Sequence, residues 1–421
     1  MSKETPYELD CKDRTLHCDP QNPDFVQNPY RLYSQMHDHS KCQNKCQSVY
    51  WQQYGHWCFA EWKQVNSLLR DKRFGRQILH IVTREELGWP EPQEHIKDFS
   101  NSEKYSLLNL EPPFHTRLRT LVNRAFVSRQ IEQLRPQVEQ LANKLIDGFQ
   151  DKQTIDFLEE FAAPIPILII TQMLGVPTEM GPQLLDWSHK IVAMYMFGRT
   201  YEDEIIANRA AKEFSDYLRD LIIQRRKNPG EDLLSHMIST EAKGEHLSDD
   251  ELISSTILLL NAGHEATVHQ SGNALKTILE SDFSPKELFA DQKQTAATIE
   301  EAIRFDAPLH MFTRFALEDV ELENGIIVKQ GEEIGLLLAA ANRDPEQFDN
   351  AQEFDPFRKS NANVTFSAGI HFCIGAPLAR LEMQVGLKTL FDRLGNMELA
   401  EKPIYSNAYH FHGLEKLMIN F

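Results

Sequence analysis

Residues 248–280 are the longest stretch of the chain that can fold as a single buried helix. The stretch contains no proline, and its roughly 33 residues would span about 48 Å at 1.5 Å per residue. Ser248 predicts where the helix begins, because a Ser followed three residues later by a Glu, here Glu251, forms a capping box. The centre of the stretch, S-T-I-L-L-L-N-A-G-H-E-A-T-V-H, is apolar on most sides, which indicates burial.

Polar residues and a glycine interrupt this apolar centre, at Asn261, Gly263, His264, Glu265 and Thr267. A glycine in the interior of a helix costs about 1 kcal/mol relative to alanine. A buried carboxylate beside such a glycine indicates a functional site. The alternative is a helix whose polar face meets solvent.

Helical periodicity dominates the chain after residue 115, and the strand patterns are short. Helices are predicted over residues 115–127, 130–150, 205–226, 248–280, 294–305 and 376–394. Strands are predicted over residues 49–54, 320–322, 326–328 and 333–338. No repeat or long linker divides the 421 residues, so we expect one mainly α-helical domain with small β-sheets over residues 1–421. Residues 1–20 are expected to form a poorly ordered N-terminal arm.

Acidic residues outnumber basic ones, with 62 Asp and Glu against 44 Lys and Arg, which gives a formal net charge of −18. Binding to nucleic acid needs a basic surface, and so does docking on an anionic membrane. No apolar run reaches the roughly 18–20 residues that span a bilayer, and the first ten residues lack the apolar core of a secretion signal. We therefore expect a cytoplasmic protein with no nucleic-acid or membrane partner, whose cysteines are reduced.

The loop F-S-A-G-I-H-F-C-I-G at residues 366–375 has the composition of a metal-thiolate site. Gly369 allows a tight turn, Gly375 lets backbone N–H groups approach the sulfur, and Pro377 suits the first turn of a following helix. The positive end of that helix would stabilise the thiolate of Cys373. One thiolate suffices as an axial ligand of haem iron but not for a zinc site. A buried structural cysteine in a glycine-rich loop is the alternative.

The pattern F-x-x-G-x-x-x-C-x-G of this loop resembles the haem-binding signature of the cytochrome P450 family. Further motifs of that family follow in the expected order: N-P-D-F-V-Q-N-P-Y at 22–30, H-T-R-L-R at 115–119, A-G-H-E-A-T at 262–267, E-A-I-R at 301–304, N-R-D-P at 342–345 and F-D-P-F-R at 354–358. The resemblance covers roughly residues 20–421. It implies a cytochrome P450-like fold that encloses a b-type haem, iron protoporphyrin IX.

The resemblance assigns the haem contacts. Cys373 is expected to be the proximal ligand of the iron, in a loop where Phe366 packs against the haem and Gly369 and Gly375 shape the turn. The haem propionates are expected to meet four basic side chains: His115, Arg119, Arg314 and His371. A structural ion-pair group is expected from Glu301, Arg304 and Arg358.

The oxygen-activating helix departs from the family pattern, in which a carboxylate is followed directly by threonine. Here Glu265 is followed by Ala266, and Thr267 comes one residue later; these three are the candidate catalytic residues. One residue is about 100° around a helix, so Thr267 cannot simply replace the missing hydroxyl. Three accounts remain: an ordered water at Ala266, a hydroxyl on the substrate, or weak coupling with leakage of peroxide.

The expected pocket contains polar groups, which favours a substrate that carries oxygen atoms, because unpaired buried polar groups cost about 1–3 kcal/mol each. The alternative is that these polar groups bond to one another or to water. Candidate substrate contacts are Leu258, Asn261, Ala262, His310, Phe411 and His412. A lid over the pocket is expected from residues 77–109 and 186–203.

The implied activity is that of a haem-thiolate monooxygenase, which uses O2 and two electrons to hydroxylate or O-demethylate a small organic molecule. Electrons are expected from NAD(P)H through a ferredoxin reductase and a ferredoxin-type partner. Four arginines are candidates for the docking surface of that partner: Arg73, Arg76, Arg117 and Arg124. We expect a monomer. The alternatives are a peroxide-driven haem-thiolate peroxygenase and a haem-thiolate sensor or binding protein.

Overall fold

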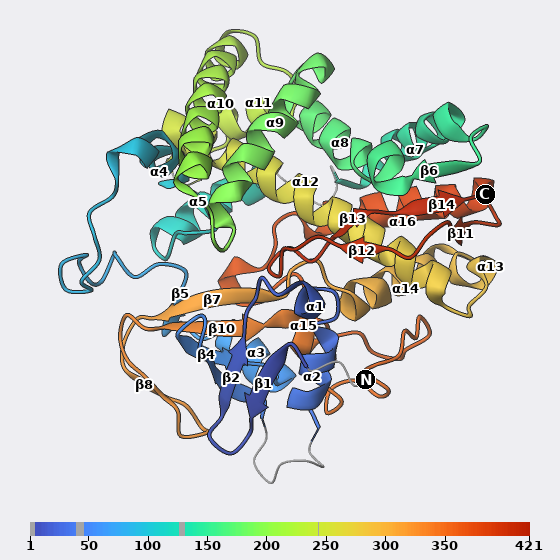
Figure 1. Cartoon of the computed structure of the whole chain (residues 1–421). Helices are drawn as coiled ribbons and strands as arrows, with labels where there is room; N and C mark the ends of the chain where they lie inside the picture. The colour runs from blue at the N-terminus through green and yellow to red at the C-terminus, as the bar shows by residue number, and fades with distance from the viewer. Residues whose placement is uncertain (1–4, 39–45, 126–130, 243) are drawn as a thin grey trace.

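The computed structural model describes residues 5–38, 46–125, 131–242 and 244–421. A helical part lies over a part that contains the largest sheet (Figure 1). The helices are α1 (Pro23–Val26), α2 (Tyr30–Met36), α3 (Trp62–Leu68), α4 (Lys97–Glu103), α5 (Phe114–Ala125), α7 (Arg135–Phe149), α8 (Pro164–Leu174), α9 (Gly181–Val192), α10 (Tyr201–Lys227), α11 (Leu233–Ser239), α12 (Asp249–Glu280), α13 (Pro285–Leu288), α14 (Gln292–Phe305), α15 (Leu338–Ala341) and α16 (Ala376–Arg393). None of the described helices combines the length and hydropathy that a membrane crossing needs.

The sheets bring distant parts of the chain together. The strands are β1 (Tyr7–Asp10), β2 (Thr15–Cys18), β3 (Ser48–Trp51), β4 (His56–Phe59), β5 (Phe74–Gly75), β6 (Thr154–Asp156), β7 (Met311–Ala316), β8 (Val320–Glu321), β9 (Ile327–Val328), β10 (Glu333–Leu337), β11 (Glu398–Leu399), β12 (Ile404–Tyr405), β13 (Leu414–Lys416) and β14 (Met418–Asn420). The largest sheet has the order β1-β2-β3-β4-β10-β7-β5. Within it, Ile334 of β10 lies opposite Trp57 of β4 and Arg314 of β7. This register fixes the position of Arg314, a predicted haem contact.

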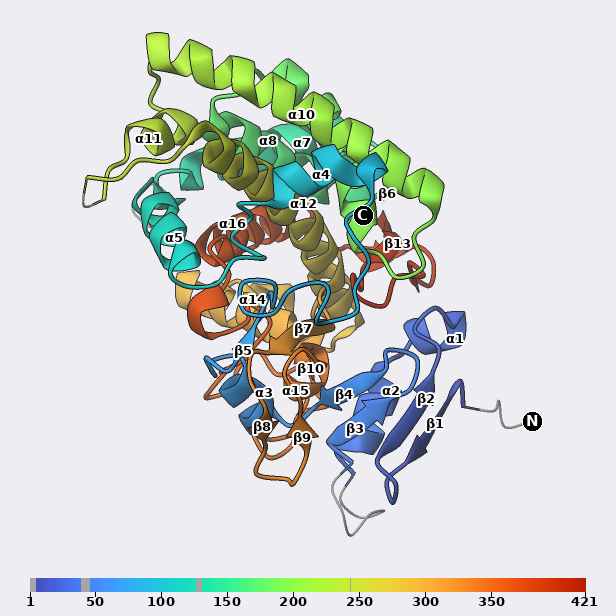
Figure 2. The same cartoon turned by 90° about the vertical axis from the view of Figure 1, so that its left-hand side faces the viewer.

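Helix α12 runs through the centre of the helical part (Figure 2). The predicted capping box is present, because the N–H of Glu251 donates to Ser248 Oγ (3.3 Å) and the N–H of Ser248 donates to the Glu251 carboxylate (2.8 Å). Helices α8, α9, α10, α14 and α16 all contact α12. The apolar centre of the helix is therefore buried, as its sequence predicts.

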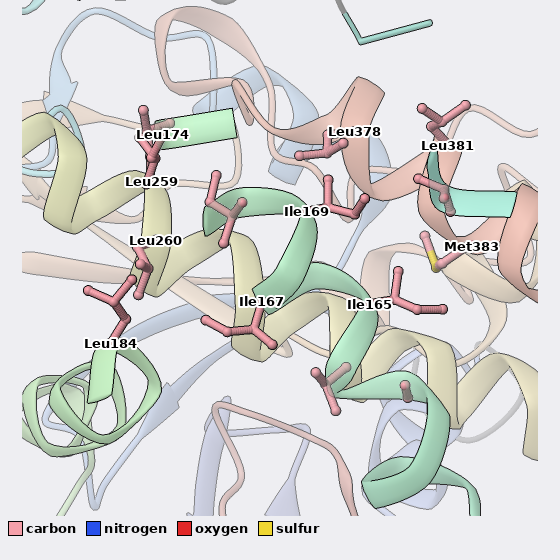
Figure 3. Close-up of a cluster of buried hydrophobic side chains, with 14 of the residues drawn as sticks. Ile165, Ile167, Ile169, Leu174, Leu184, Leu259, Leu260, Leu378, Leu381 and Met383 are labelled. Atoms are coloured by element: carbon pink, nitrogen blue, oxygen red, sulfur yellow. The ribbon is translucent and has the colours of Figure 1, made fainter. Parts of the chain in front are cut away.

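Aliphatic side chains fill the core between α8, α12 and α16. Figure 3 labels members of this cluster: Ile165, Ile167, Ile169, Leu259, Leu260, Leu378 and Leu381. The sequence of α8, P-I-P-I-L-I-I-T-Q-M-L, is apolar on nearly every side, and Gly175 ends the helix with a φ of 69°. This packing holds α12 against α16, the helix that follows the thiolate loop.

Each predicted helix and strand is present, with ends that differ by a few residues. The predictions for residues 126, 127 and 130 lie outside the described residues. The sequence patterns missed many of the remaining elements, among them α8, α9 and β7. Helix α8 is apolar on nearly all sides and so has no polar face to reveal its period, and the sequence of β7, M-F-T-R-F-A, does not alternate cleanly.

The prediction of a poorly ordered arm over residues 1–20 is wrong for residues 7–18. Strands β1 and β2 form an antiparallel hairpin, and β2 pairs in parallel with β3 through Thr15 and Tyr50. Leu16 and Cys18, two residues apart, point into the second hydrophobic cluster of the core. Burial of alternate side chains therefore orders this segment.

The expectation that all cysteines are reduced is also wrong. Cys11, in the turn between β1 and β2, forms a disulfide with Cys46, just before β3. Pairing of β2 with β3 brings the two cysteines together, which spacing alone could not predict. Cys18 and Cys58 are free and buried, and Cys42 lies outside the described residues.

Candidate active site

The thiolate loop folds back on itself just before α16. The N–H of Cys373 donates to the carbonyl of Phe366 (2.9 Å). Gly369 has a φ of 69°, and a Cβ at this position would lie 2.6 Å from the carbonyl oxygen of Leu69. Glycine is therefore required at this turn. The resulting loop leaves the Cys373 thiol unpaired and exposed.

The surroundings of Cys373 suit a sulfur that is bound to a cation. Desolvation raises the pKa of the free thiol. The backbone N–H groups of Gly375 and Ala376 and the charges of Arg119 and Arg380 act in the opposite direction, but the net shift is upward. A metal ion at the sulfur would deprotonate it outright. A Cβ at Gly375 would lie 3.9 Å from the sulfur, an ordinary contact. The missing side chain of Gly375 is therefore not what allows the backbone N–H groups to approach the Cys373 sulfur.

The four basic residues predicted to bind propionates are neighbours. The rings of His115 and His371 are 4.5 Å apart. Burial, followed by the charges of His371 and Arg119, lowers the pKa of His115 to about 4. Burial, followed by the charge of Arg76, lowers the pKa of Arg314 to about 9. His115 is 1% exposed, and neither of its ring nitrogens has a hydrogen-bond partner. Such a cluster fits the two carboxylates of a haem.

Glu111 and Arg76 belong to the same cluster, although sequence patterns did not single out either for this role. Glu111 Oε1 accepts hydrogen bonds from His371 Nε2 (3.1 Å) and from the backbone N–H of Arg76 (2.5 Å). The Arg76 guanidinium donates to the carbonyl of Thr313 (2.9 Å). The position of Glu111 four residues before His115, directly ahead of the helix, is a signal that could have identified it.

One face of α12 is open, although the rest of the helix is buried. Leu258, Ala262 and Ala266 are accessible and four residues apart, which places them in one row. A Cβ at Gly263 would meet no atom within 4 Å. Asn261, at the edge of this face, is buried, and its side-chain oxygen has no hydrogen-bond partner. The helix thus presents Leu258, Ala262 and Ala266 to an open space, and the amide oxygen of Asn261 lies buried at the edge of this face.

Thr267 lies away from this open face. Its hydroxyl donates to the carbonyl of Gly263 (2.9 Å), and its side chain is buried beside a cavity of about 10 Å³. The candidate catalytic role of Thr267 is therefore not supported, because its hydroxyl is committed to its own helix. Glu382 of α16 lines the same small cavity, and burial raises its pKa to about 8.

Glu265 is surrounded by histidines that sequence patterns did not assign to it. Its Oε1 accepts a hydrogen bond from His189 Nε2 of α9 (2.7 Å), and its Oε2 lies 3.6 Å from His269 Nε2. Desolvation raises the pKa of Glu265, but the hydrogen bond from His189 and the nearby charges of His189, His264 and His269 together outweigh it, and the net shift is downward. The same bond raises the pKa of His189. Glu265 is therefore held as a carboxylate with a histidine donor.

The predicted substrate contacts His310 and His412 lie in a closed polar network instead. His310 Nδ1 is 2.9 Å from the Tyr33 hydroxyl, and His412 Nε2 is 3.6 Å from Asp306 Oδ1. Both histidines are buried by protein atoms. Their side chains are not available to a substrate in this arrangement. Phe411 is half-buried, and its backbone forms an isolated β-bridge.

The predicted ion-pair group is present and buried. Glu301 accepts hydrogen bonds from Arg304 (2.7 and 2.8 Å) and from Arg358 (3.3 Å). The preceding residue, Glu300, pairs with Arg380 at the edge of this region, where both side chains are partly exposed. The Glu301 group joins α14 to the segment that leads into the thiolate loop, and it therefore helps to fix the position of that loop.

The two segments predicted to form a lid meet on α10. Helix α4, in the first segment, and the short helix Ala193–Tyr195, in the second, both contact α10. The hydroxyl of Tyr195 shares a hydrogen bond with the carboxylate of Glu103, which joins the two segments directly. Trp89 packs on Phe315 of β7 instead, with the ring centroids 5.7 Å apart.

Comparisons with known proteins agree with this geometry. The family model for Cytochrome P450 matches residues 90–282 and 284–396. The polyketide biosynthesis cytochrome P450 PksS of Bacillus subtilis is 32% identical over 95% of this chain and 98% of that protein, and the biotin biosynthesis cytochrome P450 of Bacillus subtilis is 30% identical over 97% and 100%. The crystal structure of P450BioI with a hexadec-9Z-enoic acid ligated acyl carrier protein has a TM-score of 0.85 and 30% identity, and covers 94% of this chain and 100% of that one.

These matches extend over almost the whole chain and include the thiolate loop and the open helix. Haem-dependent oxidation by O2 is the chemistry that the family shares. The chain therefore belongs to the cytochrome P450 family and is an oxidoreductase of the haem monooxygenase type.

Proposed function

We propose that this chain binds one b-type haem through Cys373 and oxidises a small organic substrate that carries oxygen. The observation that carries the proposal is the free thiol at the start of α16, close to the basic cluster of His115, Arg119, Arg314 and His371. When bound, the haem supplies reductive activation of O2, which thiolate ligation favours.

The basic cluster is proposed to hold the haem propionates. The unpartnered ring nitrogens of His115 and the buried guanidinium of Arg314 would gain hydrogen-bond partners from two carboxylates. Glu111 then holds His371 in position within the cluster through its existing hydrogen bonds. Replacing Arg314 with Ala should speed transfer of haem to an acceptor protein, and unchanged transfer would contradict this role.

The open face of α12 is proposed to meet the substrate. Leu258 and Ala262 offer apolar contact, and the free side-chain oxygen of Asn261 can accept a hydrogen bond from a substrate hydroxyl. Satisfying that buried oxygen is worth about 1–3 kcal/mol. A methyl group at Ala266 leaves room for a water or a substrate hydroxyl at the position where the family pattern has threonine.

Glu265 and His189 are proposed to pass protons to this pocket. His189 is half-exposed, and its Nε2–H donates to the buried Glu265 carboxylate, so the pair links solvent to the interior of α12. The hydrogen bond from His189 and the three neighbouring histidines together keep the Glu265 carboxylate ionised, so it can accept and return a proton. Retention of this pair disfavours a peroxide-driven enzyme, which needs no such delivery.

Electrons are proposed to come from NAD(P)H through a ferredoxin reductase and a ferredoxin-type donor that docks beside the thiolate loop. Three large apolar side chains are exposed on the loop and at the start of α5: Phe114, Ile370 and Phe372. Arg119 donates to the carbonyl of Phe372 and so connects these two elements (2.5 Å). Groups of exposed apolar side chains are typical of interaction sites, and these three are proposed to form one.

The four arginines suggested by the sequence are less suited to docking. Arg76 is enclosed, as described above. Arg73 pairs with Asp71 (2.6 Å), Arg117 with Glu251 (2.6 Å), and Arg124 donates to the carbonyl of Glu241. Because these groups already have protein partners, we base the docking proposal on the apolar side chains.

A turnover assay separates the proposed function from its alternatives. Haem-loaded protein is supplied with O2, NAD(P)H, reductase, ferredoxin and each ligand that shifts the haem spectrum, with methoxylated and hydroxylated compounds included in the screen. Oxidised product is expected only with the complete electron chain. Equal turnover with H2O2 alone would instead indicate a peroxygenase, and failure to oxidise any ligand would indicate a sensor or binding protein.

A further inference from the structure

We infer that His189, His264 and Glu265 form a binding site for a divalent transition-metal ion such as Zn²⁺ between α9 and α12. One ligand atom from each residue lies within 4.8 Å of the others. The site is additional to the haem and uses residues from the lid and from the oxygen-activating helix. It extends the proposed function, because Glu265 belongs to both.

The distances suit a small ion after minor side-chain movement. His189 Nε2 is 2.7 Å from Glu265 Oε1, and His264 Nδ1 is 3.9 Å from the same oxygen. Ligand atoms at 2.0–2.1 Å from a tetrahedral zinc ion are about 3.3 Å apart. The first pair would therefore open by about half an ångström, and the second would close by a similar amount.

His264 provides the independent observation that a ligand is missing from this cluster. Its side chain is only 3% exposed, and at most one ring nitrogen has a partner, the carbonyl of Ala163, so the other nitrogen is free. A buried imidazole of this kind, directed at a carboxylate and a second imidazole, is a suitable ligand for a metal.

The donor set selects the type of ion. Two imidazoles and one carboxylate with room for water match zinc and its neighbours in the transition series, whereas Mg²⁺ and Ca²⁺ prefer oxygen ligands. The side chain of His189 is 53% exposed, which gives the ion a route from solvent. His269 Nε2, 3.6 Å from Glu265 Oε2, can orient the carboxylate from outside the metal site.

The second group of possible ligands, Asp306, His310 and His412, is a weaker candidate among the described residues. All three side chains are buried. Asp306 already accepts hydrogen bonds from Tyr30 (3.1 Å) and Tyr405 (2.5 Å). An ion would have to displace these bonds and would have no exposed ligand by which to enter.

Binding of a metal ion by His189, His264 and Glu265 would affect catalysis. The ion would fasten α9, part of the proposed lid, to α12, and would withdraw Glu265 from proton transfer. Zinc should therefore inhibit turnover, and a chelator should restore it. The site would let the availability of a transition metal regulate the enzyme.

The test is equilibrium dialysis of the haem-loaded protein against ZnCl2, with bound zinc counted per chain. We expect one tight site in the wild type, and at least a tenfold loss of affinity for His189→Ala and for Glu265→Gln. His80→Ala, which removes an exposed histidine outside the cluster, is the matched control and should bind zinc like the wild type. MgCl2 in excess should not displace the zinc.

The inference is overturned if His189→Ala and Glu265→Gln bind zinc as tightly as the wild type, or if the wild type has no stoichiometric site. Thermal melting of each variant establishes that the fold is kept, and His189 is exposed enough for its replacement to be tolerated. Because dialysis measures binding without turnover, a failure of the proposed monooxygenase function would leave this result unaffected, and the two failures can be told apart.

Discussion

At the scale of single residues, Ala266 is the position where this chain departs from the pattern of its family. It lies on the open face of α12, while Thr267 is buried and bonded to Gly263. Either a water or a substrate hydroxyl takes the place of the missing threonine hydroxyl, or coupling is weak and peroxide leaks.

The first prediction concerns Ala266→Thr. If a substrate hydroxyl fills the role, an added threonine should leave the product formed per NAD(P)H almost unchanged with the native substrate, or lower it by crowding. Ala262→Thr, one turn away on the same face, is the control for crowding alone. A large rise in coupling for Ala266→Thr would refute the substrate-assisted account.

Glu382 provides a second residue-scale prediction, on pH. Its folded-state pKa of about 8 is far above the ordinary value of 4.5, so the folded protein holds a proton that the unfolded chain releases. The stability of the wild type should fall as pH rises from about 4.5 to 8 and then level off, and Glu382→Gln abolishes this loss. The variant should gain on the order of 3 kcal/mol over wild type between pH 5 and pH 9.

Thermal melting across this pH range measures the effect. Glu415→Gln, at an exposed position, is the control: its Tm should differ from that of the wild type by the same amount at every pH. A constant difference for Glu382→Gln as well would show that the buried carboxyl does not titrate as described.

At the scale of elements, ion pairs of two kinds lie side by side on α14. Glu301 is buried with Arg304 and Arg358, and Glu300 pairs with Arg380 where both are partly exposed. We expect Glu301→Gln to lower the free energy of unfolding by about 3–5 kcal/mol, because two buried guanidinium groups lose their counter-charge. Glu300→Gln should cost at most about 1 kcal/mol.

Denaturant unfolding of the two variants checks this prediction. Equal losses would contradict it, since adjacent positions on one helix differ here in burial and partners. The haem loop should also loosen in Glu301→Gln, which faster loss of haem would reveal.

Some of these elements could be predicted from the sequence and others could not. Capping residues and the apolar centre of 248–280 predict α12 almost to the residue, since these signals are local. Helix α8 and strand β7 were missed because neither has a clear period. Motif residues such as Cys373 and Arg314 could be named in advance, whereas His189 and Glu111 act through contacts between separate elements that no local pattern encodes.

At the scale of the whole molecule, the charge of −18 raises the question of how an acidic electron donor could dock. The exposed apolar group of Phe114, Ile370 and Phe372 offers contact that does not depend on charge. Phe114 is 69% exposed, so its removal should not disturb the core.

We predict that Phe114→Ala raises the KM for the ferredoxin several-fold and leaves the haem spectrum unchanged. Phe357→Ala removes a phenylalanine that is also exposed but packs near Phe283, and should leave this KM unaltered. Steady-state reduction of the haem with increasing ferredoxin provides the measurement. An equal KM for both variants and the wild type would place the docking surface elsewhere.

The account rests above all on Cys373 as the ligand of the haem iron. The direct measurement is the carbon monoxide difference spectrum of the reduced, haem-loaded protein, in the wild type and in Cys373→His. The wild type is predicted to give the thiolate band at about 450 nm, and the variant to lose it while still binding haem. A folded, haem-loaded wild type without this band, or a Cys373→His variant that retains it, would contradict the account.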